Sequence, residues 1–311
     1  MFLSFWISVF FAVFLFGDLP SIYVSKNFLI GIFVSSATLM LGGFFDDKYR
    51  IRPVLQIVPP IIACLAIIAS GVGVEFVTNP IGEGVVHLDL VQWHFADFFG
   101  KPLHFVLFAD IFTFVWLMGM MFTTKLLDGL DGLVSGITTI GAFILFALSL
   151  TDKTYQPDVS LISIILAGAF AGFLIFNAHP AKIFLGEGGS LFAGFMLGVV
   201  AIISGGKVAT ALLIMGVPIL DVAWVIFRRM FLERRSIGKG DSKHLHFRLL
   251  TAGLTHRQSV FLLWGLSALF GVASLFMQTQ GKVYCLAVLV LVTLILGIWT
   301  TKRSKSLLDR H

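Results

Sequence analysis

Residues 159–176 read VSLISIILAGAFAGFLIF, a run of eighteen residues without a single charge. A helix of roughly 17–25 apolar residues crosses the hydrocarbon core of a bilayer. Similar runs recur along the chain, which is 58% hydrophobic and only 13% charged, whereas soluble domains carry about 25% charged residues. A bilayer leaves unpaired backbone groups without water, which favours helices, and the runs lack the alternation of barrel strands. The sequence therefore predicts an all-α, polytopic transmembrane bundle.

The apolar runs predict about ten helices within one integral membrane domain, residues 1–311. The expected spans are residues 1–16, 28–45, 54–70, 104–122, 133–150, 159–176, 190–203, 207–229, 259–277 and 282–300. Residues 1–16 lack a small-residue cleavage site, so we expect a first helix and not a signal peptide. Cys64 and Cys285 both lie in apolar runs, which argues against a disulfide framework or a cysteine-based metal site.

The lysine and arginine residues predict the orientation of these spans. Seventeen of the 22 fall in loops on one side, and the positive-inside rule places that side in the cytoplasm. Segment 228–258 then becomes a cytoplasmic basic, histidine-containing loop, and 71–103 an external loop whose alternation at 74–77 and 85–90 allows a small hairpin. The net charge of +5 favours contact with anionic lipid or phosphate over nucleic acid.

Asp46 and Asp47 are adjacent carboxylates at the end of a predicted span. They repel each other, and the low dielectric at a membrane boundary strengthens that repulsion, so the pair can share a cation. Such a pair suits proton abstraction or Mg²⁺ binding. The alternative is a solvated helix end that Lys48 and Arg50 balance.

Asp128 and Asp131 lie in a second acidic motif, Asp-Gly-Leu-Asp-Gly. Their spacing of three puts them on one face if the segment is helical, and the glycines let a phosphate or metal approach the backbone. The alternative is an acidic first turn that the helix dipole stabilises. Glu187 follows in the run NAHPAKIFLGEGGS, residues 177–190, where Ser190 can cap a helix or the glycine turn can bind an anion.

The loop 228–258 holds eight basic residues and the pattern His244-Leu-His246. Basic groups beside carboxylates suggest a diphosphate held between Mg²⁺ and Arg or Lys. The alternative is a topology signal with incidental histidines. Asp221 lies inside an apolar run, so it is either a functional carboxylate or one that makes a structural hydrogen bond between helices.

These motifs occur in one order between about residues 31 and 258, and together they resemble the MraY/WecA superfamily of polyprenyl-phosphate N-acetylhexosamine-1-phosphate transferases. The Pro-Ala-Lys-Ile-Phe run and the His-Leu-His pattern are similar to the WecA and teichoic-acid initiator branch. The resemblance implies transfer of a sugar-1-phosphate, expected to be N-acetylglucosamine-1-phosphate, from a UDP-sugar to undecaprenyl or another polyprenyl phosphate. UMP leaves, in the first membrane step of cell-envelope polysaccharide synthesis. The implied location is the bacterial plasma membrane, with the active site facing the cytoplasm.

The resemblance also implies the site. Catalytic roles fall to Asp46, Asp47, Asp128, Asp131 and His244, metal binding to Glu187 and Asp128, and substrate binding to Lys125, Asn177, Lys182, His246 and Arg248. The expected cofactor is Mg²⁺, with Mn²⁺ as a substitute. The expected partners are a UDP-N-acetylhexosamine, a polyprenyl phosphate lipid and the membrane, with a homodimer left open and no nucleic acid.

Four residues depart from the family pattern. Lys125 stands where Asn is usual, Glu187 where Asp is usual, Phe247 where His is frequent and Gln56 where Lys is common. Lys125 either pairs with Asp46 or Asp128, or binds the diphosphate as a point charge; we expect a metal retained on Glu187, with Lys125 touching a phosphate oxygen. The family's further N-terminal helix and basic loop have no match, so we expect weak activity from this chain alone.

Two other functions compete with this interpretation. An intramembrane prenyltransferase also uses an Asp-rich magnesium site for a diphosphate, but it does not need the basic histidine loop. A transporter places its polar groups near the bilayer midplane in broken helices, whereas these carboxylates are predicted at helix ends. Labelled UDP-sugar binding distinguishes the first alternative, and uptake into vesicles the second.

Overall fold

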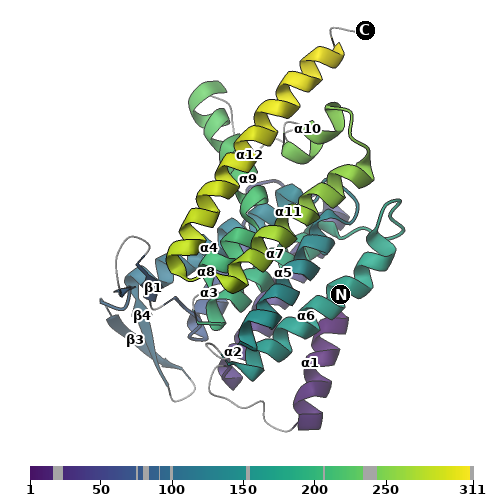
Figure 1. Ribbon diagram of the computed structural model, residues 1–311. Helices are drawn as coiled ribbons and strands as arrows, with labels where there is room; N and C mark the ends of the chain where they lie inside the picture. Colours follow the sequence, from purple (N-terminus) through teal and green to yellow (C-terminus); the bar gives the residue numbers. More distant parts are fainter. Residues whose placement is uncertain are drawn as a thin grey trace.

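The computed structural model describes residues 1–16, 24–74, 76–79, 84–90, 92–98, 101–151, 155–205, 207–233 and 244–308. The helices pack side by side in one bundle, with strands at one end and α12 reaching beyond the bundle at the other (Figure 1). This confirms the predicted all-α class. The basic stretch 234–243 of the predicted cytoplasmic loop lies outside the described residues.

The helices of the described chain are α1 Phe2–Phe16, α2 Lys26–Tyr49, α3 Val58–Ala69, α4 Leu107–Leu127, α5 Leu133–Ser149, α6 Pro157–Asn177, α7 Gly186–Ile203, α8 Val208–Ile214, α9 Gly216–Phe227, a π-helix η1 Arg228–Glu233, α10 Leu245–Thr251, α11 His256–Phe276 and α12 Thr279–Leu308. Each predicted apolar run falls on one of these helices, except 207–229. That run is broken at Met215, where α8 and α9 meet at a bend of 79°.

Six of the described helices are long and apolar enough to cross a membrane, or seven if the bent pair α8–α9 forms one span. Three shorter apolar helices, α1, α3 and α5, occupy other predicted spans. The chain is therefore a multi-pass membrane protein, as the apolar runs predict. The count of ten spans is not confirmed.

Two antiparallel hairpins fill much of the segment between α3 and α4. Strand β1 Phe76–Thr78 pairs with β2 Val85–His87, so the predicted small hairpin is present. A second hairpin, β3 Gln92–Phe98 with β4 Lys101–Val106, was not predicted. Its register shifts between His94 and Ala96, and such a bulge breaks the two-residue alternation by which a strand is recognised.

Helix α7 lies at the centre of the bundle and is buried along almost its whole length. Its glycines allow this, because small residues let membrane helices approach closely. A Cβ on Gly194 would overlap the Met120 carbonyl and Thr124 of α4, and one on Gly198 would crowd Leu117 of the same helix. The central position of α7 brings its first turn, with Glu187, to the place where other helices end.

Candidate active site

The end of α2 is held between α3 and the start of α7 by two glycines. A Cβ on Gly42 would overlap Pro59 of α3, and a Cβ on Gly43 would overlap the backbone of Gly188 in α7. The Glu187 N–H consequently points at Asp47 Oδ1, at 3.4 Å. The two consecutive glycines thus set the last turn of α2, and its carboxylates, against the first turn of α7.

Asp46 and Asp47 face different partners. Asp46 is buried, and its Oδ1 accepts hydrogen bonds from the Ile51 N–H at 3.0 Å and from Gln56 Nε2 at 3.1 Å. Asp47 is exposed beside the start of α7. Only one carboxylate of the predicted pair is therefore open to a substrate, while the other holds the segment that follows α2.

A chain of polar contacts runs from Asp46 across the site to α7. Gln56 donates to Asp46, and its Oε1 accepts a hydrogen bond from Lys125 Nζ at 3.0 Å. The same ammonium lies 2.9 Å from Glu187 Oε2. Lys125 pairs with neither Asp46 nor Asp128, the two partners considered from the sequence. The reason is positional: Lys125 lies in the last turn of α4, which packs along α7 and faces its first acidic residue.

The turn 128–132 separates Asp128 from Asp131. Helix α4 ends at Leu127 and α5 begins at Leu133, and Gly132 adopts a φ of +79°. The predicted shared helix face is therefore wrong, because the glycines that admit a ligand also end the helix. Asp128 forms the C-terminal cap of α4 and lies close enough to Glu187 for their charges to interact. Desolvation by the surrounding protein, followed by the negative charges of Glu187, Asp131 and Asp47, raises the pKa of Asp128 to about 7.

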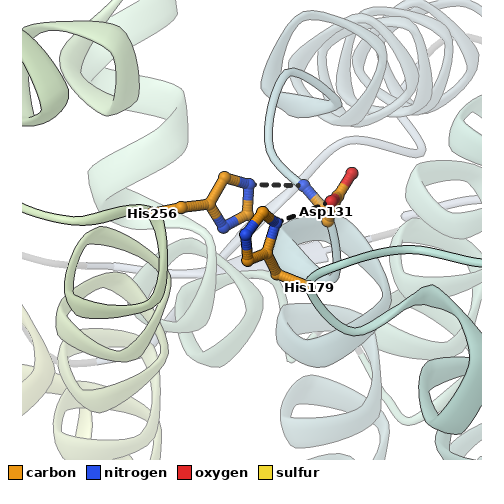
Figure 2. Close-up of side chains that lie close together, drawn as sticks. All are labelled: Asp131, His179 and His256. Atoms are coloured by element: carbon orange, nitrogen blue, oxygen red, sulfur yellow. Dashed lines mark hydrogen bonds and ion pairs between the residues drawn. The ribbon is translucent and has the colours of Figure 1, made fainter.

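Asp131 belongs to a different group of side chains, shown in Figure 2. Its Oδ2 accepts hydrogen bonds from His179 Nδ1 at 2.9 Å and the Ala181 N–H at 3.2 Å, and its own N–H donates to His256 Nε2 at 3.1 Å. Burial of the carboxyl opposes ionisation. The hydrogen bonds from His179 and Ala181 and the nearby histidines outweigh it, so the pKa of Asp131 is lowered.

The group Asp131, His179 and His256 has donor atoms within 4.8 Å of one another, a spacing at which a metal ion can bind. The ring arrangement argues against one common ion. The two imidazoles stack with centroids 4.0 Å apart and planes 20° apart, so their in-plane lone pairs cannot converge. His256 Nε2 also accepts the Asp131 N–H. As arranged, this is a hydrogen-bonded and stacked cluster that fixes Asp131.

Asn177 connects the Asp128–Gly132 turn to the following loop. Its Oδ1 accepts hydrogen bonds from Ser135 Oγ at 2.6 Å and the Gly132 N–H at 3.2 Å, and its Nδ2 donates to the Ile183 carbonyl at 2.9 Å. Asn177 is buried, and its amide oxygen and nitrogen are already hydrogen-bonded within the protein. The loop that it holds, residues 178–185, exposes Lys182.

The predicted cap at Ser190 is wrong. Helix α7 begins at Gly186, four residues earlier, and Ser190 lies inside the helix with its Oγ donating to the Glu187 carbonyl at 3.0 Å. Gly186 adopts a φ of +71°, a conformation that suits glycine. A Cβ there would stand 2.7 Å from Asp47 Oδ2. The glycine turn therefore starts the helix directly against a carboxylate of α2.

His244 is buried against Asp221. Its Nδ1 lies 2.9 Å from Asp221 Oδ2, and the Leu245 N–H donates to Asp221 Oδ1 at 2.8 Å. Asp221 therefore makes structural hydrogen bonds between α9 and the start of α10, which was one of the two interpretations considered from the sequence. His246 stacks on His244, with centroids 5.7 Å apart and planes 5° apart.

The His246 ring reaches the acidic turn. A Cβ on Gly129 would overlap its Nε2, and neither ring nitrogen has a hydrogen-bond partner among the described residues. Burial, reinforced by His244 and opposed by Asp221, lowers the pKa of His246 to about 4. His246 is therefore a neutral imidazole at neutral pH, with polar atoms against the turn that bears Asp128.

Arg248 faces α12 and not the acidic turn. Its Nη2 donates to the Gly297 carbonyl and to Thr301 Oγ1, both on α12. The family resemblance placed it with His246 among the substrate-binding residues. On α10, however, the spacing of two residues from His246 turns the side chain to another face of the helix.

Four residues that the structure brings into the site were not assigned to it from the sequence: Gln56, His179, His256 and Arg257. Gln56 was noted only as a departure from a family pattern. Arg257 Nη2 donates to the His179 carbonyl at 3.3 Å, which joins the last three. A signal was available for His256 and Arg257, since Thr255-His-Arg-Gln258 forms a capping box. A Thr-x-x-Gln motif before an apolar run marks a helix start, and hence a histidine at the membrane boundary.

Comparison with known proteins identifies related chains. A profile described as "Glycosyl transferase family 4" matches residues 29–205, more than half of the chain. A probable undecaprenyl-phosphate N-acetylglucosaminyl 1-phosphate transferase of Bacillus subtilis is 27% identical over 269 residues, which cover 85% of this chain and 70% of the relative. A decaprenyl-phosphate N-acetylglucosaminephosphotransferase of Mycolicibacterium smegmatis is 30% identical over 310 residues, covering 90% and 72%. A phospho-N-acetylmuramoyl-pentapeptide-transferase of Streptococcus mutans is 32% identical over 182 residues, covering 56% and 52%.

Proposed function

This chain belongs to glycosyl transferase family 4, and we propose that it transfers N-acetylglucosamine 1-phosphate from a UDP-sugar to a polyprenyl phosphate. A phosphate oxygen of the lipid forms a bond to the β-phosphorus of the nucleotide sugar, and the bond from that phosphorus to UMP breaks. The observation that carries the proposal is the meeting of Asp47, Asp128 and Glu187 where α2 and α4 end and α7 begins. The names of the relatives support the same reaction.

The carboxylates fit a divalent cation, and we propose Mg²⁺, with Mn²⁺ as a substitute. Hard cations prefer oxygen ligands. Desolvation raises the pKa of Asp128 to about 7, and the negative charges of Glu187, Asp131 and Asp47 add to the shift; such an ion would offset these like charges. Asp128 and Glu187 would hold it. When bound, it would neutralise charge on the diphosphate of the donor. In its absence the Lys125 ammonium supplies the positive charge at Glu187.

Asp47 is the carboxylate that we assign to the lipid phosphate. It is exposed, whereas Asp46 is buried and bonded to Ile51 and Gln56. A phosphate monoester has a second pKa of about 6, so the acceptor is mostly ionised at neutral pH and needs a base only for its remaining proton. Asp46 instead positions the end of α2 through Gln56, and thereby the direction in which Asp47 points.

The loop 178–185 is the side of the site that we assign to the nucleotide. Lys182 and the ring of Phe184 are exposed on it, Phe184 to 75%, and they offer a cation for phosphate and a flat apolar face on which a base can stack. Asn177 and the cluster of Asp131 and His179 hold this loop at both ends. Its geometry is therefore prepared before a ligand arrives.

We place the site on the cytoplasmic face of a bacterial plasma membrane. Nucleotide sugars are cytosolic, and the positive-inside rule puts the end of the bundle that carries the acidic turns there. The hairpins β1–β2 and β3–β4 lie at the opposite end (Figure 1) and would be external. A cysteine at Lys182 should react with an impermeant maleimide only after cells are opened, and reaction in intact cells would contradict this orientation.

The reaction is tested with membranes that contain the chain, undecaprenyl phosphate and a panel of UDP-sugars, with UMP release as the readout. We expect release with UDP-N-acetylglucosamine that needs both the lipid phosphate and a divalent cation. Asp89→Asn, in the segment that follows β2, is the matched control and should leave the rate unchanged. Release that does not depend on the lipid, or no release at any enzyme level with any UDP-sugar, would refute the assignment.

A further inference from the structure

A large groove lies between α9, α10 and α12. Its volume is about 1190 Å³, and apolar side chains make up most of its lining, among them Trp224 and Phe227 of α9 and Leu294 and Ile298 of α12. The residues that line it come from α9, the first residue of η1, α10 and α12. The acidic turns and the ends of α2, α4 and α7 contribute none of these described lining residues. This groove is thus separate from the proposed active site.

One end of the groove is basic. Arg228, Arg248 and Lys302 line it, together with the hydroxyl groups of Thr301 and Ser304, while Asp221 is the single acidic lining residue. Asp221 is already engaged by His244 and the Leu245 N–H. Arg248 lies close enough to Arg228 for their positive charges to repel. Arg228 is already paired with Glu233, whose Oε1 lies 3.4 Å from its Nε, so a phosphate at this end would be bound by Arg248 and Lys302.

We propose that this groove binds an anionic glycerophospholipid of the surrounding membrane. Its phosphate would lie at the basic end formed by Arg248 and Lys302, and its acyl chains would lie against the apolar walls of α9 and α12. An apolar groove that ends in clustered basic residues at the cytoplasmic surface is the arrangement that recognises anionic lipid headgroups. The acceptor lipid is a different ligand, because its phosphate must reach Asp47 beside α7.

The bound lipid would also steady the active site. Arg248 and His246 lie on the same short helix, α10, and the His246 ring contacts Gly129 in the acidic turn. Arg248 ties α10 to α12 through Gly297 and Thr301. A phosphate that bridges Arg248 and Lys302 would add a second link between these helices and hold His246 against the turn.

Trp224 allows a direct test, because it lines the groove and is 45% exposed. A variant that keeps Trp224 as its sole tryptophan is placed in phosphatidylcholine vesicles, and brominated phosphatidylglycerol or brominated phosphatidylcholine is added as quencher. We expect phosphatidylglycerol to bind about fivefold more tightly per basic contact. The matched control keeps only Trp299, which lies on α12 but does not line the groove. Because Arg303 lies over its ring, Trp299 should show at most a small preference for phosphatidylglycerol, well below that at Trp224.

Two substitutions on α12 locate the ligand. Lys302→Gln should lower the preference for phosphatidylglycerol at Trp224 about fivefold. Gly297→Leu places a side chain beside Arg248 and should reduce quenching by both lipids. If the tryptophan replacements unfold the protein, native mass spectrometry gives the same comparison in chains that keep all their tryptophans. The amount of phosphatidylglycerol retained is compared between the unsubstituted chain, Lys302→Gln and Gly297→Leu.

Two outcomes would overturn the proposal. Equal binding constants for both lipids at Trp224, unchanged by Lys302→Gln, would mean that the groove holds bulk lipid only. Displacement of brominated phosphatidylglycerol by polyprenyl phosphate at lower concentration than by unlabelled phosphatidylglycerol would assign the groove to the acceptor lipid. Neither outcome depends on UMP release, so failure of the lipid proposal and failure of the proposed reaction are distinguishable.

Discussion

Asp128 and Asp131 lie three residues apart on one turn, yet the protein shifts their pKa values in opposite directions. Asp128 faces Glu187 and Asp47, and desolvation with these like charges raises its pKa to about 7. Asp131 accepts hydrogen bonds from His179 and Ala181, and its pKa is lowered. The turn therefore separates an acidic side, where Asp128 is surrounded by like charges, from a histidine side, where Asp131 is already hydrogen-bonded. The first is suited to binding charge, and the second to holding the turn in place.

The largest effect is expected on the acidic side. Asp47→Asn and Glu187→Gln should each lower the rate of UMP release by about 10²–10⁴ at saturating Mg²⁺, because a proton or metal role is lost. The rates are compared at equal protein level, with Asp89→Asn as the control. Near-normal turnover in both variants would remove the acidic side from the chemistry.

The histidine side should respond as one unit. Asp131→Asn removes the acceptor of the His179 hydrogen bond, and His179→Ala removes its donor. If the pair positions the turn together, the double variant should cost little more than the worse single one, with a coupling of about 0.5–3 kcal/mol. A double-mutant cycle on kcat/KM measures this. Additive losses would mean that Asp131 and His179 act separately and do not position the turn as one unit.

The ammonium of Lys125 partly neutralises the negative charge of the acidic side. Lys125→Asn removes the ammonium 2.9 Å from Glu187, so we expect about tenfold tighter binding of Mn²⁺ by electron paramagnetic resonance. The KM for the nucleotide sugar should rise while the metal requirement persists, because a charge that contacts phosphate is lost. Lys125→Arg is the matched control that keeps the charge. Normal turnover in excess EDTA would contradict a metal on Glu187.

The smallest effect concerns stability against pH in protein stripped of metal. A carboxyl whose folded pKa is raised binds more protons when folded, so the Asp128 contribution should fall as pH rises from about 4 to about 7. Asp131, with a lowered pKa, should act oppositely, contributing stability above the unfolded value and losing it as pH falls. Melting temperatures of Asp128→Asn between about pH 4 and 7, and of Asp131→Asn below about pH 4, report the two signs. Equal changes of melting temperature with pH in both variants would mean that Asp128 and Asp131 do not have oppositely shifted pKa values.

Much of this arrangement follows from the sequence, because its strongest signals are physical necessities. Uninterrupted apolar runs must become helices in a bilayer, so the bundle and its acidic helix ends were predictable. The division between Asp128 and Asp131 was not, since helical spacing says nothing of where a glycine ends the helix. Glu187 as the partner of Lys125 also depends on how α4 packs on α7, which spacing along the chain does not encode. The direction of Arg248 was missed for the same reason, because α12 supplies its partners from 49 and 53 residues away.

The two glycines near the end of α2 also fix the rotation of its last turn about the helix axis. Gly42 and Asp46 are four residues apart and share one face, which meets α3 and Gln56, while Gly43 and Asp47 share the next face, which meets α7. The close contact of each glycine thus determines which neighbour the carboxylate one turn later faces. Inserting one residue before Gly42 would leave these faces intact, but inserting one between Gly43 and Asp46 would rotate both carboxylates by about 100°. The two insertions are equal in size, but only the second should move the buried carboxylate of Asp46 to the exposed position that Asp47 now occupies.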